Sequence, residues 1–487
     1  MNYLDESRRK SPTVKFERLL ELSRAALLSL ILLSLYSNSF VKSDALEELP
    51  RGTVVDKVAC QANPAESYAL FLPSNYSADK KWPILYAFDP GARGKIPVSL
   101  FKDAAEQYGY IVVGSNNSRN SEPAGAIINN LLLDTHARFS IDERRVYATG
   151  FSGGARLACL LGSRSGGSVA GVIACSGGFP AGITPTQSTP FVLFGTAGTE
   201  DFNFQEMKQL NRTLDSMGIA NTLAIFEGDH AWPPQELAVK ALEWMEIQAM
   251  KAGRREKDDV LIDRLLPRKV ESARASQAAG KIYDAYVAYQ SLVVEFRGLR
   301  DVTEYEQTAT GLRNSKAVKE AIKYEEGQKN KERQLTEQFV VLVGKLNDPN
   351  DPFSAAANYQ LAIANLKRDA EAKIDSGNRR VSRRVLQQLL VAFYEQATLL
   401  YQQKNYSAMA GKLELAREIR PEAPGLLYNL AVAYALSGRK RKALDTLEKA
   451  VASGFTDLAK MKADDDLTTL RDEPDFKRIV QTLDRNR

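Results

Sequence analysis

One serine in this chain stands in a setting that favours nucleophilic chemistry. Ser152 is the centre of the run 150–154, Gly-Phe-Ser-Gly-Gly, which follows an apolar stretch and precedes an Ala- and Leu-rich segment. A strand, a tight turn and a helix in that order are typical of a nucleophile elbow, in which strained backbone lifts a serine Oγ clear of a sheet. Gly150 and Gly154 lack a Cβ, so strand and helix can approach closely. N–H groups at the helix start would face the serine and suit an oxyanion.

A serine nucleophile needs a general base, and this chain has only two histidines. His136 precedes Ser152 in a segment with a helical pattern, which favours a structural role. His230 follows Ser152 and lies in a loop between a predicted strand and a predicted helix. We therefore expect His230 to accept the serine proton.

A carboxylate that could orient the histidine lies between the two. An apolar strand that starts at Phe191 ends in a loop that carries Glu200 and Asp201. Ser, Asp and His then follow one another along the chain, each just past the end of a predicted strand. That order is the one found in α/β-hydrolases, and it differs from the orders of other serine triads. Asp201 is the predicted acid, and Glu200 stays open as its rival because the loop is long.

These features resemble a compact esterase-type α/β-hydrolase, similar to dienelactone hydrolases, polyhydroxybutyrate depolymerases and feruloyl esterases. The resemblance rests on the elbow 150–154, the acid loop at Asp201 and the run His-Ala-Trp-Pro-Pro at 230–234. It covers about 200 residues, from about 55 to 250. It implies a mostly parallel sheet with helices on both faces.

The resemblance is weaker at the oxyanion hole. Relatives carry His-Gly after the early strand, whereas this chain has Asp89-Pro90-Gly91 with Arg93 close behind. Pro90 has no N–H to donate. We expect the N–H of Gly153 to form one side of the hole and the N–H of Gly91 or a neighbour to form the other, with Arg93 or another cation neutralising Asp89.

A polar loop follows another predicted strand, at the edge where open α/β sheets bind ligands. It contains Asn116, Asn117 and Arg119. Either these side chains and Trp232 contact the substrate, or the loop is a solvated turn with a helix cap. About fifteen residues separate the strand that ends at Cys175 from the next one, which leaves no room for a lid.

Length and composition limit the number of domains and the classes of function. With 487 residues the chain has room for two to four domains, and 65 basic against 60 acidic residues argue against a dedicated nucleic-acid binder. Two separated histidines and three scattered cysteines form no metal-ligand pattern. We divide the chain into a signal or anchor at 1–45, a hydrolase domain at 46–252, degenerate helical repeats at 253–389, and tetratricopeptide-like repeats with capping helices at 390–487.

The first 45 residues have the pattern of an export signal. Six basic residues precede an uncharged apolar run, 25–36, which is followed by small polar residues. The run is shorter than the roughly 20 residues that span a bilayer. We expect an exported, periplasmic or secreted protein, with an uncleaved membrane anchor as the alternative.

Helical patterns replace strands after about residue 251. A charged segment, 251–259, suggests a linker that few contacts cross. Towards the end, small and apolar residues recur with a period of 34, for example Ala397 with Ala431. This resembles tetratricopeptide repeats, which stack helix pairs into surfaces that bind proteins.

Together these patterns predict an exported serine hydrolase, most directly a carboxylic ester hydrolase acting through an acyl-enzyme and needing no cofactor. A peptidase or an acyltransferase is the alternative within enzymes, because the same triad serves all acyl transfer. A catalytically silent hydrolase fold that acts as a repeat-based scaffold is the alternative outside them. We expect a small-molecule or polymeric ester substrate, a protein partner on the repeats and no nucleic acid.

Overall fold

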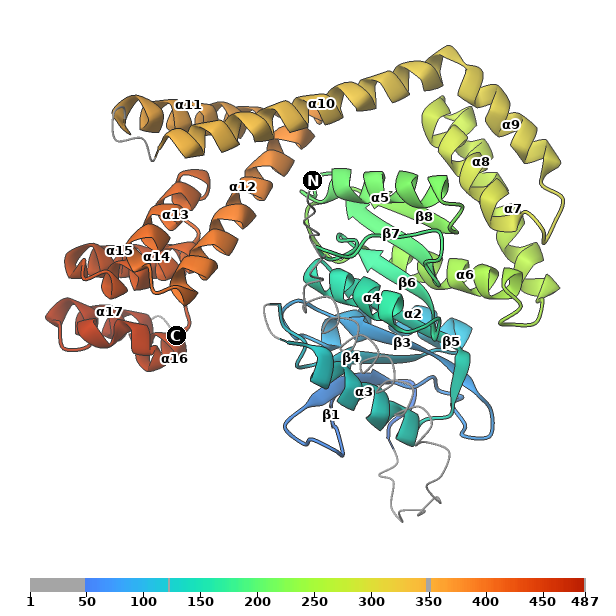
Figure 1. The fold of residues 1–487 in the computed structure, drawn as a ribbon, viewed down its shortest axis with the longest axis horizontal. Coiled ribbons are helices and arrows are strands. Elements are labelled where there is room, and N and C mark those ends of the chain that lie inside the picture. Colours follow the sequence, from blue (N-terminus) through green and yellow to red (C-terminus); the bar gives the residue numbers. More distant parts are fainter. Residues whose placement is uncertain (1–48, 121–122, 347–351, 486–487) are drawn as a thin grey trace, which may run out of the picture. The chain divides into compact units, whose positions relative to one another are not determined.

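The N-terminal part of the protein is built on one sheet. The computed structural model describes residues 49–120, 123–346 and 352–485. Eight strands lie in the order β1-β2-β4-β3-β5-β6-β7-β8 (Figure 1). β1, β2 and β4 pair antiparallel in turn, and the strands from β4 across to β8 are parallel. The strands are β1 Val54–Ala59, β2 Ser67–Phe71, β3 Trp82–Phe88, β4 Ile111–Ser115, β5 Ile141–Phe151, β6 Val169–Cys175, β7 Val192–Gly198 and β8 Asn221–Phe226.

Helices cover both faces of this sheet. β3 and β6 are buried at every position, which explains why they are almost continuously apolar. Apolar residues of α2 and α6 pack on one face, and α3, α4 and α5 lie on the other. These helices are α2 Lys95–Tyr108, α3 Gly125–Arg138, α4 Gly153–Arg164, α5 Phe204–Ser216 and α6 Gln235–Lys251. The predicted α/β-hydrolase fold is confirmed.

The rest of the described chain is helical, as predicted. Its helices are α7 Asp259–Ala278, α8 Ile282–Phe296, α9 Thr303–Asn314, α10 Lys316–Lys345, α11 Pro352–Ala370, α12 Gly377–Gln402, α13 Tyr406–Ile419, α14 Pro424–Leu436, α15 Lys440–Ala452, α16 Leu458–Ala463 and α17 Pro474–Arg485, with a 3₁₀ turn at Asp465–Leu470. α12 packs against α13, and α14 against α15. One apolar core runs through these helices and continues to α17.

The period of 34 residues has a structural counterpart. Ala397 and Ala431 are both buried in the core of the helical region. Lys404 and Gly438, also 34 positions apart, end the first helix of each pair with positive φ, 57° and 76°. The left-handed turn is retained at Lys404 although glycine adopts it at lower cost, because the second helix of each pair must return along the first.

The prediction that few contacts cross the segment 251–259 is wrong. Arg255 forms ion pairs with Glu246 of α6 and with Asp258, which caps α7. Arg254 donates to the backbone oxygen of Arg144 in β5. Apolar residues from the end of α6 share one core with α7 and α8, among them Ile247, Met250, Leu261, Ile262 and Leu292. The charged segment therefore forms ion pairs with the neighbouring helices, one of them to the buried Glu246, and is not a solvated hinge.

Two further predictions concern the N-terminal segment and the cysteines. The predicted export segment, 1–45, lies outside the described residues, and no helix within them is long and apolar enough to cross a membrane. Cys60, Cys159 and Cys175 are all free and buried. Burial raises the pKa of Cys60 to about 11, with added repulsion from nearby carboxylates, and it raises the pKa of Cys159 and Cys175 to about 12. They act as core residues.

Candidate active site

Ser152 occupies a strained turn between β5 and α4. Its backbone has φ 53° and ψ −116°, a conformation that costs energy in a residue with a Cβ. A Cβ added to Gly150 would come within 2.1 Å of the Gly154 oxygen, and one added to Gly154 within 2.0 Å of the Phe88 oxygen. Both glycines are therefore required where strand and helix meet. The first N–H groups of α4, which have no partner inside a helix, lie beside the serine.

His230 connects the serine to a carboxylate. Its Nε2 lies 2.9 Å from Ser152 Oγ, and its Nδ1 lies 2.9 Å from Asp201 Oδ1. The Asp201 side chain is fully buried, and that of His230 is 17% exposed. The structure thus joins the ends of β5 and β7 to the loop after β8, and the predicted serine, acid and histidine form one hydrogen-bonded chain.

Two aromatic rings hold the imidazole in place. The ring of Phe202 lies 4.2 Å from that of His230, and the ring of Phe151 lies 4.6 Å from it, centroid to centroid. Neither residue was predicted from the sequence. Their positions carried the signal, because each stands directly beside a predicted member of the triad.

The choice between the two acids is decided by their surroundings. Asp201 Oδ1 accepts a second hydrogen bond from the Asn203 N–H at 2.8 Å, at the start of α5. Asn203 in turn donates its side-chain amide to the Ser176 oxygen. Glu200 points away from this cluster and pairs with Arg383 of α12 at 2.7 Å. Glu200 is therefore a contact to the helical region, and Asp201 faces the histidine.

The expected second oxyanion donor needs correction. The Gly91 N–H donates to Asp89 Oδ1 at 2.8 Å, and the next N–H, of Ala92, donates to the Asp89 backbone oxygen. Neither N–H points to an oxyanion in this arrangement, because the loop uses both to close its own turn. Gly153 keeps the predicted place at the first turn of α4.

Asp89 organises this loop. Its side chain is fully buried, and Arg93 pairs with it at 2.8 Å, as expected. Burial by itself would raise the pKa of Asp89, but hydrogen bonds from Arg93, Trp232 and Gly91 outweigh it and hold the pKa below its ordinary value. Trp232 Nε1 donates to Asp89 Oδ2 at 3.0 Å, so this hydrogen bond fixes the ring beside the loop, and a substrate contact of Trp232 stays a prediction.

Two of the residues predicted to contact substrate bond to neighbouring strands of the sheet. Asn117 Oδ1 accepts the Ser67 N–H of β2, and Asn116 donates to the Asp56 backbone oxygen of β1. Both amides replace strand pairing at the point where the loop leaves the sheet. Arg119 is exposed and pairs with Gly91 through its backbone.

Asn120, the next residue of the same loop, reaches the elbow. A Cβ added to Gly153 would lie 1.9 Å from Asn120 Oδ1 and 2.6 Å from its Nδ2. The carboxamide therefore lies against the Gly153 backbone and brings a side-chain donor to the side of the serine turn. The sequence pointed to this loop, but it did not distinguish Asn120 from its neighbours.

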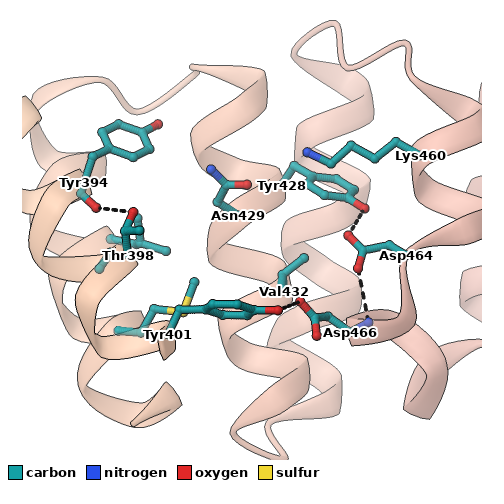
Figure 2. A pocket seen from close by; sticks show the side chains of 12 residues that line it. Tyr394, Thr398, Tyr401, Tyr428, Asn429, Val432, Lys460, Asp464 and Asp466 are labelled. Atoms are coloured by element: carbon teal, nitrogen blue, oxygen red, sulfur yellow. Dashed lines mark hydrogen bonds between the residues drawn. The ribbon is translucent and has the colours of Figure 1, made fainter. Parts of the chain in front are cut away.

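The helical region contains a separate groove of about 260 Å³ (Figure 2). Tyr401 donates to Asp466 at 2.8 Å, and Tyr428 donates to Asp464 at 2.7 Å. Lys460 places its ammonium 4.8 Å from the centre of the Tyr428 ring. The groove thus combines aromatic rings of α12 and α14 with carboxylates of the segment that follows α16.

Known proteins match this chain at the level of structure. No protein-family model matches the sequence, and no curated protein does. Among solved structures, an S-formylglutathione hydrolase from Staphylococcus aureus is 15% identical, with 40% of this chain and 98% of that one covered and a TM-score of 0.33. A ferulic acid esterase is 17% identical over 40% of this chain and 97% of its own, with a TM-score of 0.34. An esterase from Pyrobaculum calidifontis is 12% identical over 41% and 86%, with a TM-score of 0.34.

Proposed function

We propose that this protein is a serine hydrolase that cleaves carboxylic esters. Ser152 Oγ attacks the acyl carbon while His230 Nε2 takes its proton, and His230 then gives that proton to the leaving alcohol. Asp201 keeps the imidazole oriented and stabilises its cationic form. Water hydrolyses the acyl-enzyme by the same proton transfers in reverse. The observation that carries the proposal is the pair of 2.9 Å contacts that His230 makes with Ser152 and Asp201.

The surroundings favour an active enzyme over a silent scaffold. A strained serine conformation persists only where the fold enforces it, and here two glycines with no space for a Cβ do so. The connection from β6 to β7, residues 176–191, contains no helix or strand that could form a lid. An open site suits soluble or polymeric esters. A peptidase or an acyltransferase would use the same three side chains, so these two activities are the alternatives.

The test is hydrolysis of para-nitrophenyl butyrate together with labelling by a fluorophosphonate. Ser152→Ala and His230→Ala should each lower kcat on the order of 10⁴- to 10⁶-fold, and Ser152→Ala should abolish labelling. Ser163→Ala is the matched control, because Ser163 lies on the same helix and its hydroxyl donates to the Cys159 backbone oxygen. Labelling of Ser152→Ala at the wild-type rate would show that another serine is the nucleophile. A parallel screen of feruloyl esters and peptides would separate esterase from peptidase activity.

We also propose that the groove of the helical region recruits a partner, an extended peptide segment that carries a basic side chain. Asp464 and Asp466 supply negative charge, and the rings of Tyr394 and Tyr401 supply faces that attract a cation. Lys460 makes such a contact with the face of Tyr428 within the chain.

Fluorescence anisotropy with a labelled lysine-rich peptide would measure this binding. Asp466→Asn should weaken binding at least about tenfold, since a charge-assisted contact is lost. Asp445→Asn is the control, because Asp445 is an exposed aspartate of α15 outside the groove. Equal affinity for a glutamate-rich peptide would contradict the proposed chemistry.

We also propose that residues 1–45 direct the export of the protein. It is supported by the order of basic, apolar and small polar residues in the sequence. Sequencing the N-terminus of the protein from fractionated cells would test it, and an intact Met1 in the cytosolic fraction would exclude it.

A further inference from the structure

The loop that carries Asp201 is contacted from the helical region on both sides of the acid. Before Asp201, the Thr199 backbone oxygen accepts a hydrogen bond from Arg384 Nη1 of α12 at 2.6 Å. After Asp201, the ring of Phe204 lies 4.8 Å from the Arg384 guanidinium carbon. One side chain of the helical region therefore spans the short segment 199–204 that presents the acid.

The Arg384 side chain is itself fixed. It is 4% exposed, and Glu332 of α10 accepts from its Nε and from its Nη2, the latter at 2.7 Å. Glu332 also accepts a hydrogen bond from Gln205, in the first turn of α5, at 3.0 Å. A planar guanidinium held by a carboxylate on two nitrogens has little freedom to turn, so it transmits the position of α10 and α12 to the backbone of the acid loop.

The two neighbouring ion pairs are more exposed and serve as comparisons. Arg383 pairs with Glu200, with side chains 33% and 17% exposed, and Arg380 pairs with Glu227, 30% and 74% exposed. Exposed pairs contribute little because water screens them and side-chain entropy opposes them. Arg384 is buried, so loss of its contacts should change the position of the loop.

We infer that Arg384, supported by Glu332, is a positioning residue for the reaction: it holds the Asp201 loop in place from outside the hydrolase domain. This inference rests on the proposed function, and it makes the helical region a structural part of the active site. A displacement of the acid by about 1 Å is enough to cost on the order of 10²-fold in rate. A ligand that shifts α10 or α12 would accordingly change turnover without touching the serine.

The experiment is a double-mutant cycle in the full chain. Arg384→Gln should lower kcat for para-nitrophenyl butyrate roughly 10- to 100-fold with KM within about twofold, because Asp201 acts on the histidine and not on substrate binding. On an Asp201→Ala background the same change should cost less than about twofold, because the group it positions is already gone. Lys331→Gln is the matched control: it breaks the exposed hydrogen bond between α10 and Asn378 of α12, and within the described residues it has no contact with segment 199–204.

Two additions keep the result decisive. Arg384→Gln combined with Glu332→Gln removes both buried charges, which protects folding if the single variant leaves Glu332 unpaired. Hydrogen exchange of residues 199–204 gives a readout without activity: Arg384→Gln should speed it roughly tenfold, and Lys331→Gln should not. Equal losses of kcat on both backgrounds, or exchange unchanged in segment 199–204, would overturn the inference. Absence of any Ser152-dependent turnover in the wild type would instead refute the proposed function, and exchange alone would then decide whether Arg384 holds the loop.

Discussion

Replacing Asp201 by asparagine separates the charge of the acid from its geometry. Asp201 Oδ1 accepts from both His230 Nδ1 and the Asn203 N–H, and the buried Oδ2 has no hydrogen-bond partner in the described part of the chain. An asparagine amide oxygen can take the Oδ1 position and keep both hydrogen bonds. The variant should therefore fold and orient the imidazole while losing the negative charge.

The size of the effect follows from that charge. Two unit charges roughly 4 Å apart at an effective dielectric constant of about 20 attract by about 4 kcal/mol. In the reaction this attraction exists only once His230 becomes cationic, so it stabilises the transition state and not the resting enzyme. At about 1.4 kcal/mol for each factor of ten, kcat should fall about 10³-fold with KM nearly unchanged.

Steady-state kinetics on para-nitrophenyl butyrate would measure this loss, with circular dichroism to check the fold. Glu200→Gln is the matched control, since it removes the neighbouring carboxylate and only loosens the partly exposed pair with Arg383. It should keep kcat within about fivefold. If Glu200→Gln were the damaging change and Asp201→Asn kept more than about a tenth of wild-type kcat, Glu200 would be the acid and the assignment from geometry would be wrong.

Two other predictions concern the fold around the site. Gly154→Ala should abolish activity and lower Tm, because its Cβ would lie 2.0 Å from the Phe88 backbone oxygen, which cannot move like a side chain; overpacking of this kind costs about 1–3 kcal/mol or more, and a normal melting curve would contradict it. His136 should make stability depend on pH: burial lowers its pKa, but the hydrogen bond and charge of Glu143 and the Leu132 oxygen raise it above the ordinary value overall. A raised pKa in the folded state gives stability that is complete below about pH 6.5 and lost as pH rises through the folded pKa, so urea unfolding between pH 5 and 9 should show a decline that His136→Ala removes.

Sequence by itself determined the features that depend on neighbours along the chain. The elbow at Ser152 could be predicted because a strand, two glycines and a helix start are local requirements. The sheet could be predicted because strands that are buried on both faces need continuous apolar runs. The helices could be predicted because turns with positive φ, such as the one at Gly438, mark where they end. The order of serine, acid and histidine followed from where those strands end.

Tertiary structure alone decided which polar groups face one another. Glu200 and Asp201 are adjacent in the sequence, and their partners distinguish them. Glu200 pairs with Arg383, which is 183 residues away, and Asp201 accepts a hydrogen bond from His230. The amides of Asn116 and Asn117 had the composition of a binding loop, yet strands β1 and β2 use them.

The linker after α6 shows the same limit on a larger scale. Its charges indicated separation between two domains, because a sequence does not show whether a charged side chain has a buried partner. In the folded chain Arg255 is paired with Glu246, and Arg384 reaches the acid loop from α12. Hydrogen bonds and ion pairs between distant residues depend on distances that only the packed helices and sheet determine, and those contacts connect the helical region to the site.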